Sequence, residues 1–187
     1  MARIAAAVTG FSSLLSLASS PKMKSDLMFG SSVSGSRLVA FSIGVHLAEA
    51  LDMLCHNQLS NLFIHHVFVI LCFSGSLITD KAVGFAVLSL VTEINSVFNK
   101  TRILHLVSGL SRASEEFQWK ARINLATFAI RMLIIAWMNQ QSLLYFGRLP
   151  LAFLLPCNFG LFFVNFWNIS VFKQLFISDL VKGTTLN

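Results

Sequence analysis

The chain has 187 residues, of which 55% are hydrophobic and only 12% are charged, and its formal net charge is +6. A soluble domain carries about 25% charged residues, so this composition excludes a water-soluble globule. The basic residues stand mostly between apolar runs and accompany no nucleic-acid-binding motif, so we expect them to face lipid headgroups and expect no nucleic-acid partner.

The first apolar segment has two interpretations. Ile4–Ala18 is short and is diluted by Ser, Thr and Gly, and small residues follow it before Pro21. Residues 1–20 are therefore predicted to form a weak first transmembrane helix or, less favoured, a signal-like segment. Residues 21–187 are predicted to form the main transmembrane domain.

Five longer apolar runs follow in chain order. They are Leu38–Leu54, Leu62–Ile78, Ala82–Phe98, Ile123–Leu144 and Leu151–Ile177. A helix needs about 20 mostly apolar residues to cross a bilayer, and none of the runs alternates like a strand of an outer-membrane barrel. The sequence therefore predicts an all-α, polytopic transmembrane helix bundle with five to six spanning helices.

One long polar segment separates the third and fourth of these runs. Lys100–Arg122 is rich in basic residues and contains apolar positions between Ile103 and Leu110. This pattern predicts a short helix that lies along the lipid headgroups.

Several ionisable side chains interrupt the apolar runs. Each costs at least about 2.5–3.5 kcal/mol at bilayer depth, so we expect them to face the bundle interior. The four on the first long run fall within roughly a 120° arc of one helix face. The expected lining of a lipid cavity comprises His46, Glu49, Asp52, His56, His65, His66, Glu93 and Arg102.

Two roles are open for this set of residues. They form either a polar clasp that fixes the order of the helices, or a cavity for a polar lipid headgroup or for acyl transfer. Arg102 or Arg131 would neutralise the carboxylates in either case. His65, His66 and Glu93 are the candidate catalytic residues, because imidazole titrates near neutral pH.

Known metal and cofactor motifs are absent from the sequence. The spacing of His56, His65 and His66 does not match the histidine boxes of membrane desaturases, and no H-E-x-x-H motif or phosphate-binding glycine loop occurs. The three cysteines form no C-x-x-C pair. We therefore expect no metal and no cofactor.

Two stretches of the chain resemble the TLC-domain family, and most of all its branch of TLC domain-containing proteins 1 and 2, the calfacilitin branch. These stretches are Ser36–Gly75 and Gly84–Arg102. The likeness rests on the Asp-Met pair before His56, on the vicinal His65-His66, and on the E-x-N-S run that leads to Arg102. It extends in weaker form from about Ala5 to about Val181.

This resemblance implies a helical bundle around a lipid-accessible central cavity. The branch is associated with control of membrane phospholipid composition and fluidity, by limiting polyunsaturated acyl chains in phospholipids. Membrane lipids, phospholipids above all, are then the expected partners. A multi-pass location in the plasma membrane is expected, with the endoplasmic reticulum membrane as the alternative.

The family leaves two further functions open. Its ceramide synthases are acyl-CoA-dependent acyltransferases with a vicinal His pair, which His65 and His66 match, so that either could accept the acyl group with Glu93 orienting it. Their D-x-S-D pattern corresponds to Thr92–Ser96 here, where only Glu93 is acidic, and this departure speaks against an enzyme. The other possibility is a modulator of a membrane channel, which would supply a membrane-protein partner.

Overall fold

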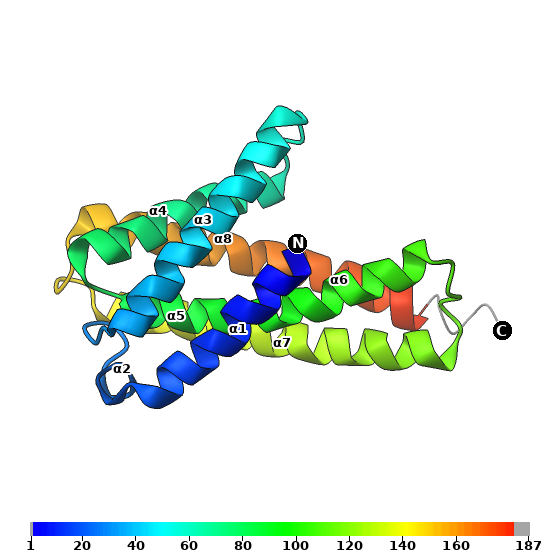
Figure 1. Ribbon diagram of the computed structural model, residues 1–187, viewed down its shortest axis with the longest axis horizontal. Helices are drawn as coiled ribbons and strands as arrows, with labels where there is room; N and C mark the ends of the chain where they lie inside the picture. Colours follow the sequence, from blue (N-terminus) through cyan, green and yellow to red (C-terminus); the bar gives the residue numbers. More distant parts are fainter. Residues whose placement is uncertain (1, 182–187) are drawn as a thin grey trace.

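The computed structural model describes residues 2–181, in which every regular element is a helix (Figure 1). The elements are α1 (Ala2–Ser19), α2 (Pro21–Ser25), α3 (Val33–Cys55), α4 (Asn61–Thr79), α5 (Val83–Val91), α6 (Glu93–Val107), α7 (Glu115–Leu144), α8 (Leu151–Leu175) and a terminal π-helix, η1 (Phe176–Val181). The predicted all-α class is confirmed.

Four stretches of helix are long and apolar enough to cross a membrane: α3, α4, α7, and α8 together with η1. Their outer faces carry large apolar side chains, for example Leu133 on α7, which is 70% exposed, and Phe166 on α8, which is 67% exposed. Apolar surfaces of this extent suit hydrocarbon rather than water. The chain is therefore a multi-pass membrane protein.

The third predicted run, Ala82–Phe98, is interrupted in the structure. Helix α5 ends at Val91 and α6 begins at Glu93, so neither piece is long enough to be counted among the four. Thr92 keeps a helical backbone at the junction, and its hydroxyl donates to the Ser89 carbonyl oxygen at 2.6 Å. The two helices nearly continue one another, and at 1.5 Å per residue their combined path is about 37 Å, enough to cross a bilayer.

The prediction of a separate headgroup helix after Lys100 is wrong. The apolar positions Ile103, Leu104 and Val107 belong to α6, whose hydrogen bonding continues without a break to Val107. The helix ends where Gly109 adopts a left-handed conformation (φ 81°). The change from apolar to polar residues near Lys100 does not end the helix, because α6 stays helical well beyond the apolar run in which it begins.

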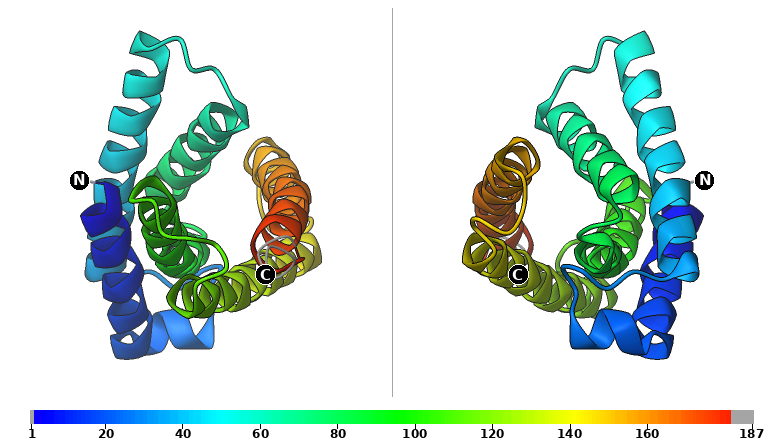
Figure 2. Two further views of the ribbon diagram at one scale, coloured as in Figure 1. Left: turned by 90° about the vertical axis from the view of Figure 1, so that its right-hand side faces the viewer. Right: turned by 90° about the vertical axis from the view of Figure 1, so that its left-hand side faces the viewer.

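The N-terminal helix packs along one flank of the bundle. Figures 1 and 2 show α1 beside α3 and the α5–α6 path. Its inner face is built of small residues: Thr9 and Ser13 are buried and donate to their own helix backbone, and Gly10 lies against Ile94 of α6. Small residues allow this close approach of two helices. That residues 1–20 span the membrane stays a prediction, as does the division at residue 20; residue 1 and residues 182–187 lie outside the described part of the chain.

Hydrogen bonds between helices hold the other flank. The Asn95 side-chain amide of α6 donates to Thr127 Oγ1 of α7 at 2.9 Å. The Ser142 hydroxyl of α7 donates to Asn158 Oδ1 of α8 at 2.5 Å. In the end-on views α4, the α5–α6 path, α7 and α8 surround a common interior (Figure 2).

The start of α5 lies unusually close to the chain that precedes α3. A Cβ atom added at Gly84 would lie 2.6 Å from the Leu27 carbonyl oxygen, whereas one added at Gly44 would meet nothing within 4 Å. We predict that Gly84→Ala lowers the free energy of unfolding by about 1–3 kcal/mol, because backbone must move to admit the methyl group. Gly44→Ala is the matched control and should be neutral or stabilising. Thermal unfolding of both variants in detergent measures the difference, and equal midpoints would contradict the close approach.

Candidate functional site

A cavity lies inside the bundle. The empty space in and around it measures about 970 Å³, a value that includes its open mouth, and it is bounded by α3, α4, the α5–α6 path, α7 and α8. Its walls are mostly aliphatic and aromatic; the polar residues among them are His46, His65, Ser76, Ser89, Thr92, Glu93, Arg131 and Ser142. An apolar interior with a few convergent polar groups is the usual form of a small-molecule site.

The charged groups of the cavity stand apart from its most apolar part. Arg131 and Met138 both line the cavity from α7, and seven residues of helix separate them by about 10 Å. The apolar part contains a buried cluster formed by Met28, Ala82, Phe85, Met138, Leu149 and Leu154. The cavity thus has a charged end and an apolar end. A fatty acyl chain with its carbonyl group has the same distribution of polar and apolar atoms.

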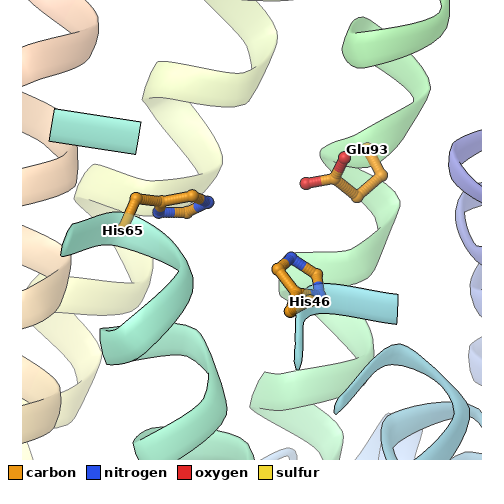
Figure 3. Close-up of side chains that lie close together, drawn as sticks. All are labelled: His46, His65 and Glu93. Carbon is orange, nitrogen blue, oxygen red and sulfur yellow. The ribbon is translucent and has the colours of Figure 1, made fainter. Parts of the chain in front are cut away.

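Three side chains from three helices meet at the charged end. His46 of α3, His65 of α4 and Glu93 of α6 each bring one ring nitrogen or carboxylate oxygen within 4.8 Å of the others (Figure 3). The figure shows all three pointing toward one another. Since they are far apart in sequence, only the packing of α3, α4 and α6 brings them together. We call this set the His–His–Glu cluster.

His46 is held in a single orientation by its own helix. Helix α3 buries Val39, Ser42, His46 and Ala50, a stripe with helical spacing that faces the bundle. The His46 Nδ1 atom lies 2.8 Å from the Ser42 carbonyl oxygen. A carbonyl oxygen can only accept, so this contact favours the tautomer with the proton on Nδ1, in which Nε2 has the lone pair.

The vicinal histidines are both buried but have different surroundings. His65 lines the cavity, and its ring lies 6.2 Å from that of Trp167 of α8. His66 is not part of the cavity wall; its Nε2 atom lies 3.5 Å from Glu49 Oε2. Glu49 is also 3.9 Å from the Lys100 ammonium. The two Nδ1 atoms, one in each ring, have no hydrogen-bond partner within the described residues.

Arg131 supplies positive charge beside Glu93. Both line the cavity, and the two side chains interact electrostatically. The guanidinium Nη1 atom of Arg131 also donates to the Ser96 hydroxyl at 3.5 Å. Of the two arginines expected to neutralise the carboxylates, Arg131 is the one placed at the cavity. Its signal in the sequence was a cation in the middle of an apolar run, and the expected lining omitted it.

The expectation that the whole ionisable face of α3 points inward is wrong for two residues. Asp52 and His56 have side chains that are 76% and 64% exposed, and they pair with each other at 3.3 Å. Figure 1 shows the ends of α3 and α4 projecting beyond the other helices. The buried stripe of α3 is centred on His46, and at 100° per residue Asp52 lies about 120° and His56 about 80° around the helix from it, so both residues fall outside that stripe.

Arg102 lies outside the cavity wall. Its guanidinium forms a buried two-point ion pair with the carboxylate of Asp179 in η1, and that aspartate is fully buried. Gln118 of α7 donates to the Asp179 backbone carbonyl at 2.7 Å. Arg102 therefore connects η1 to α6, and Gln118 connects it to α7. Sequence reasoning missed Asp179, because it follows the last apolar run and no periodic pattern includes it.

Comparison with known proteins gives one consistent result. The family model of the TLC domain matches residues 4–176. TLC domain-containing protein 2 of Danio rerio is 35% identical over 95% of this chain and 73% of its own length. The protein of the same name from Homo sapiens is 29% identical over 94% of this chain and 68% of its own length. TLC domain-containing protein 1 of Gallus gallus is 33% identical over 55% of this chain and 42% of its own. No solved structure matches the chain.

The ion pair between Arg102 and Asp179 has a measurable consequence. We predict that Asp179→Asn lowers the free energy of unfolding by about 3–5 kcal/mol, because it leaves the Arg102 charge buried without its partner. Asp52→Asn removes the same charge at an exposed position and should change stability by no more than about 0.5 kcal/mol. Denaturation of both variants in mixed micelles measures the two changes in stability. A loss for Asp179→Asn as small as that for Asp52→Asn would show that the buried pair does not stabilise the fold.

Proposed function

Since this chain belongs to the TLC-domain family, we propose that it is a lipid-binding protein that regulates the phospholipid composition of its membrane. It limits the polyunsaturated acyl chains of membrane phospholipids and thereby sets membrane fluidity, and it acts at the plasma membrane. One observation carries this proposal: a cavity within a membrane-spanning bundle that is apolar at one end and charged at the other.

The cavity wall suits an acyl chain better than a water-soluble ligand. Phe68 and Phe153 line it with aromatic surface, and polar side chains are few outside the charged end. An acyl chain in this space keeps apolar contacts along its length. Its carbonyl or carboxylate group would reach donors such as Arg131, which lipid itself cannot provide.

Binding of this kind regulates composition through differences in affinity. A protein that takes up one class of acyl chain more readily than another changes which chains remain available for phospholipid synthesis and exchange. The cavity wall contains bulky rings as well as small residues such as Ser89 and Gly160, so we expect acyl chains of different shapes to fit it unequally. The proposal requires no chemical step.

The proposal is tested with a substitution that fills the cavity and with measurement of the acyl composition of cellular phospholipids. Cells given a polyunsaturated fatty acid should show a lower polyunsaturated fraction in their phospholipids when the wild-type chain is present. Ser89→Phe places an aromatic ring in the cavity and should return the fraction to the level of cells without the protein. Ile78→Phe is the control, because Ile78 is 84% exposed on the outer face of α4.

Two results would decide against the proposal. One is a wild-type chain that leaves the phospholipid acyl profile unchanged under the fatty-acid load. The other is a Ser89→Phe variant that is present at normal levels and shifts the profile as strongly as the wild type, since then the cavity would not be the site of action.

Acyl transfer is a second candidate function, favoured by the position of His65. Its ring lies in the cavity with Nδ1 unpartnered and Glu93 close by. In such a reaction an imidazole nitrogen attacks the thioester carbonyl of acyl-CoA, the CoA thiolate leaves, and an acceptor hydroxyl or amine then takes the acyl group from the ring.

The structure makes unequal predictions for the two vicinal histidines under this second function. His65→Ala should abolish acyl transfer by the purified chain, whereas His66→Ala should reduce it less, because His66 lies behind the cavity wall against Glu49. His56→Ala, at an exposed position, is the control. Transfer that survives His65→Ala would reject the role, and absence of transfer by the wild type would leave the lipid-binding function alone.

A further inference from the structure

The fold brings together metal-ligand residues whose spacing in the sequence matches no known metal-binding motif. His56 is exposed and lies outside the cavity, while His46, which the sequence motifs did not group with His65 as a ligand, lies beside His65 and Glu93. We propose that the His–His–Glu cluster binds a divalent transition-metal ion, with zinc as the preferred ion.

The type of donors supports this proposal. Two imidazoles and one carboxylate form the ligand set of catalytic zinc sites and of facial non-haem iron sites. No cysteine and no second carboxylate belongs to the cluster. This combination favours zinc or another borderline metal over calcium or magnesium, which require mainly oxygen ligands.

The distances also fit. With metal–nitrogen bonds of about 2.0–2.1 Å, the donors of a tetrahedral site lie about 3.4 Å apart. The three donor atoms of the cluster lie within 4.8 Å of one another, so small side-chain rotations bring them to an ion between them. They come from three helices, so the ion would also connect α3, α4 and α6.

The state of the histidine rings prepares them for an ion. The bond from His46 Nδ1 to the Ser42 carbonyl orients the ring and leaves Nε2 as a lone-pair donor, which is the second-shell arrangement of metal-bound histidines. His65 is only 8% exposed, and its Nδ1 atom has no partner within the described residues. The ring offers one of its two nitrogens to the cluster, and its burial would shield a metal–nitrogen bond from water.

Arg131 does not prevent binding. A carboxylate has two oxygens, so Glu93 can bind the ion with one and keep its contacts to Arg131 and Ser96 with the other. Three protein ligands leave one position open, and because all three residues line the cavity, that position faces the cavity. The extra positive charge there would favour a carboxylate or carbonyl oxygen at the head of a bound chain.

The experiment measures metal directly, on the full chain purified in detergent. Zinc content is determined by mass spectrometry after dialysis against metal-free buffer, and cobalt is then titrated in, with its visible absorption reporting the coordination. We expect one zinc ion per chain and the bands of tetrahedral cobalt in the wild type. We also expect zinc to raise the midpoint of thermal unfolding.

Single substitutions locate the site. His46→Ala, His65→Ala and Glu93→Gln should each weaken zinc binding by at least about tenfold and abolish the thermal shift. His56→Ala should bind zinc like the wild type and controls for adventitious binding to a histidine. Glu93→Gln preserves side-chain volume, so it keeps the test valid if a histidine variant fails to fold.

Either of two results would overturn the proposal. The first is a folded wild-type chain with no zinc above background, no cobalt spectrum and no thermal shift. The second is zinc binding that Glu93→Gln and the histidine variants leave unchanged, which would place the ion elsewhere. Neither result bears on the phospholipid profile, so the metal site and the proposed function fail independently.

Discussion

Hydrocarbon offers no hydrogen-bond partners, and this constraint organises the molecule. Every polar side chain in an apolar run must find its partner inside the protein, because lipid will not supply one. Asn95, Thr127, Ser142 and Asn158 meet this demand in pairs across neighbouring helices. The outer faces of α7 and α8 are left to large apolar side chains. Two of the buried side-chain atoms that have no partner within the described residues, His65 Nδ1 and Arg131 Nε, belong to residues at the charged end of the cavity.

Two charged centres inside the bundle follow from the same constraint but differ in kind. Arg102 and Asp179 neutralise each other in a closed pair that fastens η1 to α6, and they leave no space between them. The His–His–Glu cluster is instead open to a cavity, and its His65 Nδ1 atom has no hydrogen-bond partner within the described residues. A closed pair serves stability, whereas an open cluster is available to a ligand. Sequence alone assigned Arg102 to the open site, because it lists charges without showing which of them face one another.

Much of the architecture could be predicted from the sequence, because it depends on local properties. Runs of about 20 apolar residues define spanning helices, and the burial of His46, His65 and His66 follows from the cost of polar groups in lipid. The errors lie where distant segments decide the outcome. Asp52 lies about 120° around α3 from His46, outside the stripe that the neighbouring helices bury, and Asp179 pairs with Arg102 from near the other end of the chain. The sequence alone shows neither which stripe of α3 is buried nor which carboxylate pairs with Arg102.

The exposed Asp52–His56 pair at the end of α3 allows the depth of the cavity in the bilayer to be estimated. If Asp52 and His56 lie in the headgroup layer, His46 lies six residues from the first and ten from the second along the helix, or about 9–15 Å deeper. The hydrocarbon core is about 30 Å thick, so the charged end of the cavity falls near the bilayer midplane. A lipid that reaches it must draw its polar group away from the water. Moving a phosphate-bearing headgroup to this depth costs far more free energy than moving an ester, an amide or a protonated acid. The depth of the site therefore selects which lipids can enter it.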